Sequence, residues 1–216
     1  MSYSGDQYAP DVRRTHLTSL PQRPSQRLLT PDAVHRNSSD QTEQPPADLS
    51  HASELMSRIN LIQELGLPTQ ADPTFDEFAQ VMAHKAGFLY GFVNLFLTEQ
   101  TFIGLHQPSV DSGYVVVERT MSREHGWCPE VVSRKKALPL HDVHASPRFS
   151  GNHVVDAVGI RSYFGAPLIH DSGTVLGTVC VIDPETRPLQ EARRLRDVVI
   201  ATSDDVMRYI ERFADR

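Results

Sequence analysis

The sequence predicts an α+β domain in which helices cover both faces of a central antiparallel sheet. Apolar residues recur at helical spacing after residue 50 and again before the C-terminus, which is typical of amphipathic helices. Between these segments, short and almost wholly apolar runs are bounded by turn residues, as expected for strands that are buried on both sides. Helices that enclose a set of strands give the layered arrangement of this class.

Two helices are expected before the first strand. The first has an apolar face and ends at Gly66 and Pro68, and this face carries Leu55, Ile59, Ile62 and Leu65. The second begins at Asp72 and Pro73, because aspartate caps a helix N-terminus and proline fits the first helical position. Its buried face should carry Phe75, Phe78 and Met82.

The apolar runs predict the strands. Residues 88–97 should form a central strand that turns at 98–100 into a partner at 101–107. Residues 137–141 contain Pro139, which cannot donate to a ladder, so they should form an edge strand or the start of a strand. A hairpin is expected from two further apolar runs on either side of Gly173, at 162–169 and 175–182.

Three further helices are expected among the remaining segments. Ser122 can cap a short helix that passes through Trp127 and Cys128 and is interrupted by Pro129. Residues 150–160 are interpreted as a surface helix, and 189–213 as a long amphipathic helix at the end of the chain.

Residues 1–49 differ in composition from the rest of the chain. They combine scattered prolines with polar and charged residues and contain few large apolar side chains. Such a segment cannot offset its ordering entropy by burial, so we expect a disordered, solvated tail. The folded domain should then occupy residues 50–216, with its core at 88–213.

Charge and cysteine content restrict the possible partners and location. The net charge of −6 and the pI of about 5.9 leave no basic field for nucleic acid or an anionic membrane. Two cysteines are too few for a secreted disulfide scaffold, and the N-terminal sequence lacks a basic segment followed by an apolar run. The longest apolar run, 88–97, is about half as long as a membrane-spanning helix. We therefore expect a cytoplasmic protein with free thiols and no nucleic-acid or membrane partner.

Three motifs in the second half of the chain resemble those of bacterial GAF domains. They are LHDVHASPRF at 140–149, VGIRSYFGAPL at 158–168 and LGTVCVID at 176–183. The resemblance implies an antiparallel sheet of five or six strands, a helical layer from the two ends of the chain on one face, and a ligand pocket on the other. Phe164 replaces the small residue that the family usually has there, which predicts crowding near the pocket floor.

The resemblance also indicates candidate residues for the pocket. Its boundaries in the family are the loop and short helix before the strand at Leu138 and the helix after that strand. The candidate ligand-binding residues are Trp127, Cys128, Asp142, Phe149, Tyr163 and Cys180. Each aromatic candidate has an alternative role as ordinary core, and Asp142 is expected to pair with Arg148 across a turn.

The chemistry of the pocket stays open in the sequence, and no cofactor is identified. Cys128 and Cys180 can lie near each other, and buried unreactive thiols are the preferred interpretation. Reduction of free methionine sulfoxide is a less favoured alternative, because the cysteine motifs of that branch are not found. We expect no haem or metal on the histidines, which match no compact ligand motif: His141, His144 and His153. A bilin or cyclic nucleotide is not supported either.

These observations predict a stand-alone sensory or regulatory module without catalytic residues. It should bind an unidentified small molecule and signal through contact with a protein partner. The alternative is a ligand-free dimerisation or interaction module. The apolar faces at 50–65 and 189–213 are long enough to pack together and to offer a surface for a homodimer.

Overall fold

The computed structural model describes residues 47–214, so the predicted tail lies outside the described residues as far as residue 46. None of the described helices combines the length and apolar character needed to cross a bilayer. The helices are α1 (Ala47–Glu64), α2 (Pro73–Ala86), α3 (Cys128–Arg134), α4 (Pro147–Ser150), α5 (His153–Val158) and α6 (Ala192–Ala214). The strands are β1 (Tyr90–Phe96), β2 (Gln100–His106), β3 (Thr120–Met121), β4 (Leu138–Leu140), β5 (Ser162–Ile169) and β6 (Val175–Asp183). Short 3₁₀ turns occupy Val110–Ser112, Val143–Ala145 and Leu189–Glu191.

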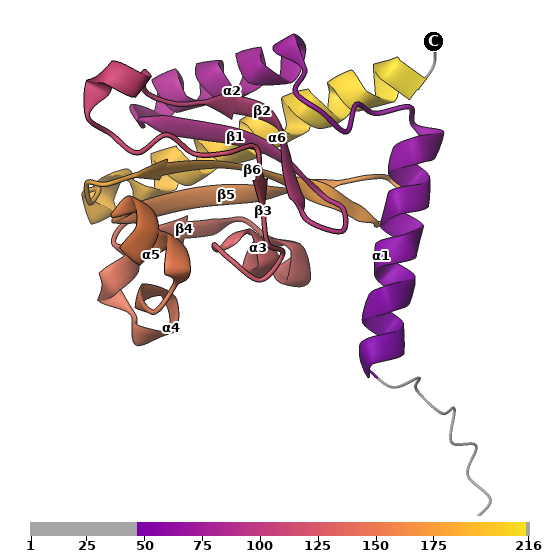
Figure 1. Ribbon diagram of the computed structural model, residues 1–216, viewed down its shortest axis with the longest axis horizontal. Coiled ribbons are helices and arrows are strands. Elements are labelled where there is room, and N and C mark those ends of the chain that lie inside the picture. Colours follow the sequence, from indigo (N-terminus) through magenta and orange to yellow (C-terminus); the bar gives the residue numbers. More distant parts are fainter. Residues whose placement is uncertain (1–46, 215–216) are drawn as a thin grey trace, which may run out of the picture. The chain divides into compact units, whose positions relative to one another are not determined.

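The six strands form one antiparallel sheet in the order β3-β2-β1-β6-β5-β4 (Figure 1). The two central strands, β1 and β6, are buried along their whole length, as their continuous apolar sequence predicts. Strand β4, which contains Pro139, lies at an edge where a missing N–H is tolerated. The predicted α+β class and the sheet of five or six strands are therefore confirmed.

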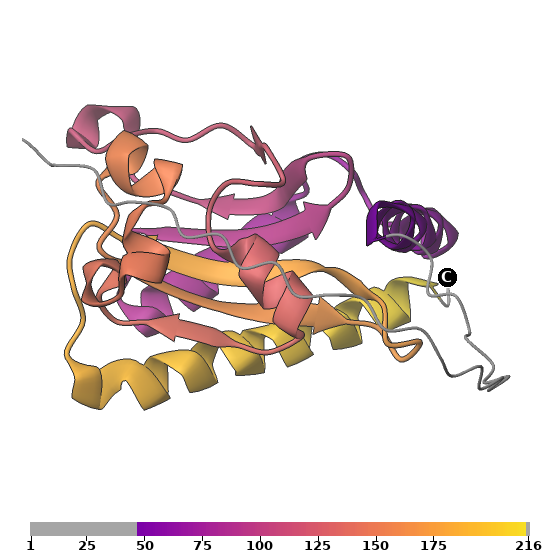
Figure 2. The same ribbon diagram turned by 90° about the horizontal axis from the view of Figure 1, so that it is seen from below.

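Helices α2 and α6 cover one face of the sheet, while α3, α4 and α5 lie on the other (Figures 1 and 2). The prediction for the start of α2 is confirmed, because the Asp72 carboxylate accepts the N–H groups of Thr74 and Phe75 at 2.9 and 3.3 Å. Glycines let α2 lie directly against the sheet. A Cβ at Gly104 would be 2.2 Å from the carbonyl oxygen of Phe75.

The expected packing of the first helix against the last is wrong. Helix α2 packs against α6, through contacts such as the edge-to-face rings of Phe75 and Tyr209, whose centroids are 5.5 Å apart. Helix α1 lies at the end of the sheet beside β6, where Arg58 donates from Nε to the carbonyl of Val175 and Ile62 joins the core (Figure 1). The apolar face of α6 is fully used within the domain, since its central side chains are buried against the sheet: Leu195, Val199, Val206 and Ile210.

Two predicted helices differ in their boundaries. Pro129 does not interrupt a helix that starts near Ser122; it stands in the first turn of α3, which begins at Cys128. The helix expected at 150–160 is divided into α4 and α5, because the Asn152 side chain caps a new helix by accepting the N–H of Val154 at 3.1 Å.

The predicted crowding by Phe164 is also wrong. Successive side chains of a strand point to opposite faces, so Tyr163 and Phe164 cannot both reach the pocket. Phe164 packs edge-to-face on Phe88, with ring centroids 5.8 Å apart, in the core beneath α2 and α6. Tyr163 belongs to the core on the opposite face.

Candidate functional site

A cavity of about 620 Å³ lies on the face of the sheet opposite α2 and α6; we call it the sheet cavity. Its floor consists of side chains from four strands: Phe92, Phe102, Tyr163, Cys180 and Ile182. Its walls come from the connection between β2 and α3 and from α5, namely residues 115–118, 120–122 and 125–128 together with Val154, Ala157 and Val158. Most of this lining is apolar, as in sites that bind small molecules.

Four of the six predicted site residues meet in this cavity. Trp127, Cys128, Tyr163 and Cys180 all line it, although they come from α3, its N-cap, β5 and β6. The rings of Trp127 and Tyr163 are inclined to each other with centroids 5.3 Å apart. The Tyr163 hydroxyl lies 3.4 Å from the Cys128 sulfur. The structure thus places an aromatic wall next to two thiols.

The other two predicted residues, Asp142 and Phe149, do not line the sheet cavity. Asp142 accepts the N–H of His144 at 3.0 Å and pairs with Arg161 at 3.4 Å. The predicted pair of Asp142 with Arg148 is therefore wrong, because Arg148 reaches Glu130 at 2.6 Å instead.

Phe149 contributes to the site through its backbone. Its carbonyl oxygen accepts the indole N–H of Trp127 at 3.2 Å, which fixes the orientation of the tryptophan ring. The Phe149 ring is partly buried and packs against the core on this face of the sheet. Phe149 therefore supports the wall without lining the hollow.

The sulfur atoms of Cys128 and Cys180 are 3.7 Å apart. The hydrogen bond that Cys180 donates lowers the pKa of Cys128 to about 7, although burial acts in the opposite direction. The same contact, together with burial, raises the pKa of Cys180 well above its ordinary value. Burial also raises the pKa of Tyr163, so its phenol stays protonated and can donate to Cys128. The pair can therefore hold one thiolate beside one thiol.

A buried side chain from β2 fixes the wall segment 122–129 from beneath. Gln100 donates from Nε2 to the carbonyl oxygens of Ser122 and His125 at 2.8 and 2.7 Å. Its Oε1 accepts from Asn94 Nδ2 at 2.8 Å. Neither amide was among the predicted site residues. The signal was Asn94 itself, a polar residue within an apolar strand, which requires a buried partner.

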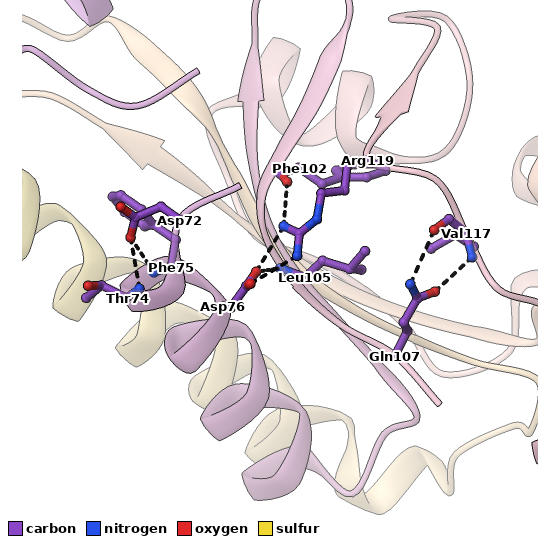
Figure 3. A network of polar contacts seen from close by, with 9 residues as sticks. All are labelled: Asp72, Thr74, Phe75, Asp76, Phe102, Leu105, Gln107, Val117 and Arg119. Atoms are coloured by element: carbon purple, nitrogen blue, oxygen red, sulfur yellow. Dashed lines mark hydrogen bonds and ion pairs between the residues drawn. The ribbon is translucent and has the colours of Figure 1, made fainter. Parts of the chain in front are cut away.

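A network of polar contacts holds the other wall segment, 115–119 (Figure 3). Gln107 binds both backbone groups of Val117: its Oε1 accepts the N–H at 2.8 Å and its Nε2 donates to the carbonyl at 3.3 Å. Arg119 forms a two-pronged ion pair with Asp76 of α2, with both N–O distances at 3.0 Å (Figure 3). The Tyr90 hydroxyl also donates to the carbonyl of Val115 at 2.7 Å.

Val115 and Val116 remain about half exposed in this segment, at 46% each, although they border the sheet cavity. The wall is thus anchored at its ends while its apolar side chains are partly in solvent. These anchors are not evident in the sequence, because they join residues that are far apart in the chain. No motif marks such pairs.

The cavity suits a ligand with a large apolar surface and few polar groups. Only Glu118 and His125 bring side chains that can be charged near neutral pH, apart from the thiols. Within residues 47–214, no group of three or more histidine, cysteine, aspartate or glutamate side chains is arranged to hold a metal ion. The cavity can therefore bind a ligand through apolar contacts and aromatic stacking, and it exposes two thiols to that ligand.

The domain therefore belongs to the α+β class, with a six-stranded antiparallel sheet, a helical layer on one face and a hollow beneath short helices and loops on the other. The sequence places this domain in a known group. The model of the GAF domain family matches residues 69–203, and the chain belongs to that family. GAF domains form a family of sensory and regulatory modules, which is consistent with the cavity described above.

Solved structures support the fold. The GAF domain of a phosphoenolpyruvate-protein phosphotransferase from Acinetobacter has a TM-score of 0.50 at 14% identity, and the match covers 74% of this chain and 94% of that one. The GAF domain of nlh2 from A. aeolicus has the same TM-score at 11% identity, with 74% and 97% covered. These identities show a shared fold alone.

One curated relative matches part of the sequence. A cyclic di-GMP phosphodiesterase of Pseudomonas aeruginosa is 38% identical over 84 residues, which are 38% of this chain. The chain spans only 14% of the length of that relative.

Proposed function

We propose that the domain is a regulatory module that binds a small, largely apolar molecule in the sheet cavity and signals through contact with another protein. The observation that carries this proposal is the open, mostly apolar hollow of about 620 Å³ bordered by Trp127 and Tyr163. A cavity of this size can bury most of a metabolite-sized ligand. The activity of the Pseudomonas relative is not part of the proposal, because the match covers so little of that protein.

The same wall segments supply a route for the signal. Residues 115–118 border the cavity but also face solvent, so a ligand that orders Val115 and Val116 changes the outer surface. Contact with a partner can then depend on occupancy, provided that the partner binds the ordered form better.

The test begins with the full-length protein purified from its native host. The native mass spectrum should show additional mass that is absent from the denaturing spectrum. An absorption spectrum should show whether the bound molecule is coloured. Ala157→Trp places a large side chain at the cavity wall, whereas Asp156→Trp is a matched change on the same helix outside the lining. The first variant should lose the additional mass and the second should keep it. A bare chain mass in the native spectrum, or binding that survives Ala157→Trp, would contradict the proposal.

The alternative is an interaction or dimerisation module that needs no ligand. Helix α1 favours it, because Met56 is exposed and Leu55 and Ile59 are only half buried, whereas the central apolar residues of α6 are fully buried. We therefore propose α1 as the contact surface of a homodimer or a partner. Ile59→Glu should reduce the mass measured by light scattering from two chains to one without lowering the melting temperature; a single chain in the unmodified protein would exclude the dimer.

A second candidate activity is the reduction of free methionine sulfoxide, favoured by the 3.7 Å separation of two thiols that line the cavity. In this reaction the two thiols supply two electrons and two protons, a disulfide forms between them, and the sulfoxide oxygen leaves as water. An external dithiol would restore the thiols. Incubation with free methionine sulfoxide should yield methionine and one disulfide per chain, and Cys180→Ser should abolish turnover. Retention of both thiols would rule this activity out.

A further inference from the structure

A second hollow of about 610 Å³ lies between α1, α3 and the turn that joins β5 to β6; we call it the α1 cleft. It differs from the sheet cavity in its lining, which is mostly polar. Basic side chains enter it from three segments: Arg58 from α1, Arg123 from the connection before α3, and Lys135 after α3. The lining also includes hydroxyl groups, among them those of Ser57, Ser133 and Ser172, and one carboxylate, that of the exposed Glu54.

Arg58 is buried and forms no ion pair with a carboxylate within the described residues 47–214. Its side chain is only 5% exposed, and Nε donates to the carbonyl of Val175. Its Nη1 has no hydrogen-bond partner among the described residues. A buried donor without an acceptor costs free energy, more so when it carries charge. Burial, and next the repulsion from Arg123, lower the pKa of Arg58, while the exposed Glu54 opposes this.

Arg123, which also lines the cleft, likewise has a buried guanidinium nitrogen without a hydrogen-bond partner among the described residues. This atom is Nε, and no ion pair of Arg123 is found within the part of the chain that the structure describes. Arg161 and Arg187 also have a buried Nε without a partner, but each of these pairs with a carboxylate through Nη2, Arg161 with Asp142 and Arg187 with Asp183. Among residues 47–214, the arginines that combine a buried, partnerless guanidinium nitrogen with the lack of a carboxylate ion pair are therefore the two that line the α1 cleft, Arg58 and Arg123.

We infer that the α1 cleft binds the phosphate group of a small phosphorylated molecule. Two guanidinium groups that approach from different segments need an anion with acceptors in more than one direction. Phosphate offers at least three acceptor oxygens and up to two charges, whereas a carboxylate has two oxygens in one plane. The hydroxyl groups of the lining can donate to the remaining oxygens. The α1 cleft is a different site from the sheet cavity, and phosphate binding in the cleft does not require a ligand in the cavity.

The test is titration calorimetry of the full-length protein with inorganic phosphate and with pyrophosphate. The unmodified chain should bind at least one of them with a Kd below about 1 mM, and binding should weaken as salt is added. Arg123→Gln should weaken binding by about tenfold or more, because one charge-assisted contact is lost. Arg58→Lys keeps the charge but removes the planar fork, so it should also weaken binding.

The matched control is Arg134→Gln. Arg134 lies on α3, is exposed and pairs with Glu130, but it does not line the cleft. Its replacement should leave phosphate affinity unchanged, and thermal melting should show that all three variants remain folded. Failure of both phosphate and pyrophosphate to bind at concentrations up to about 10 mM would overturn the inference. So would equal losses in Arg123→Gln and Arg134→Gln, or citrate binding as tight as that of pyrophosphate.

Discussion

The two faces of the sheet are both apolar, but one is filled and the other is hollow. On the face beneath α2 and α6, the long helices lie directly on the strands, and the buried side chains form a continuous core. On the opposite face, α3, α4 and α5 are short and are joined by loops, and the sheet cavity lies between them and the strands. The difference lies in the covering elements and not in the strands.

The contrast suggests a division of roles between the two faces of the sheet: the filled face contributes stability, and the hollow face offers a binding site. A long amphipathic helix presents a regular ridge that fills the groove of its partner, whereas short helices and loops leave space between them. Polar anchors such as Gln100 and Asp76 then hold the loops where packing does not. Changes on the filled face should therefore lower stability, while changes on the hollow face should alter binding and local motion.

The largest effect is expected from Gly104→Ala on the filled face. The new Cβ would lie 2.2 Å from the Phe75 carbonyl oxygen, so α2 would have to move away from β2. We expect a loss of about 3 kcal/mol in the free energy of unfolding, measured by urea denaturation. Gly151→Ala is the matched control, since its Cβ would meet no atom within 4 Å and its φ is −84°. Equal stability of the two variants would refute the close packing of α2.

A smaller effect is expected at the thiols on the hollow face. Iodoacetamide reacts with thiolates, so alkylation of Cys128 should rise with pH and reach half its maximum near pH 7. Cys180→Ala removes the hydrogen bond that lowers this pKa most, while burial, which raises it, remains. The midpoint should then move upward by about one pH unit or more, so that the rate at pH 7 falls. Mass spectrometry of the labelled peptides identifies the modified residue; an unchanged midpoint would show that Cys180 does not control Cys128.

The smallest effect on global stability is expected from Arg119→Ala. The Arg119–Asp76 pair is about one-third exposed, so its loss should cost no more than about 1 kcal/mol. Locally, the segment 115–119 loses an anchor, and hydrogen exchange at Val115 and Val117 should accelerate while α2 stays protected. Arg196→Ala removes an exposed ion pair on α6 and is the control. Unchanged exchange in residues 115–119 would show that Arg119 does not hold this wall.

Local chemistry made much of the fold predictable from the sequence. Asp72 and Pro73 specify the start of a helix by themselves, and the apolar run around Val93 can be satisfied only by burial on both faces. Pro129 was misread because the same residue can end one helix or begin the next. Only the position of the neighbouring turn distinguishes these two cases.

The candidate site was less predictable, because it depends on contacts between distant segments. Trp127 and Tyr163 follow from the position of their elements in the family, and the structure places both at the cavity. The partner of Asp142 is the arginine that the folded chain brings close to it in space. This is Arg161, although Arg148 is nearer in the sequence. The side chains of Arg58 and Arg123 meet only after α1 has docked at the end of the sheet.

Segment 122–129 is a wall common to the two hollows. Ser122, Trp127 and Cys128 border the sheet cavity, while Arg123 and Pro129 border the α1 cleft. Gln100 holds this segment in one position from below. If a ligand in one hollow shifts the segment, thermodynamic reciprocity requires that a ligand in the other changes the first affinity by the same factor. A single short stretch of backbone can therefore make the domain respond to a combination of two molecules instead of to either one alone.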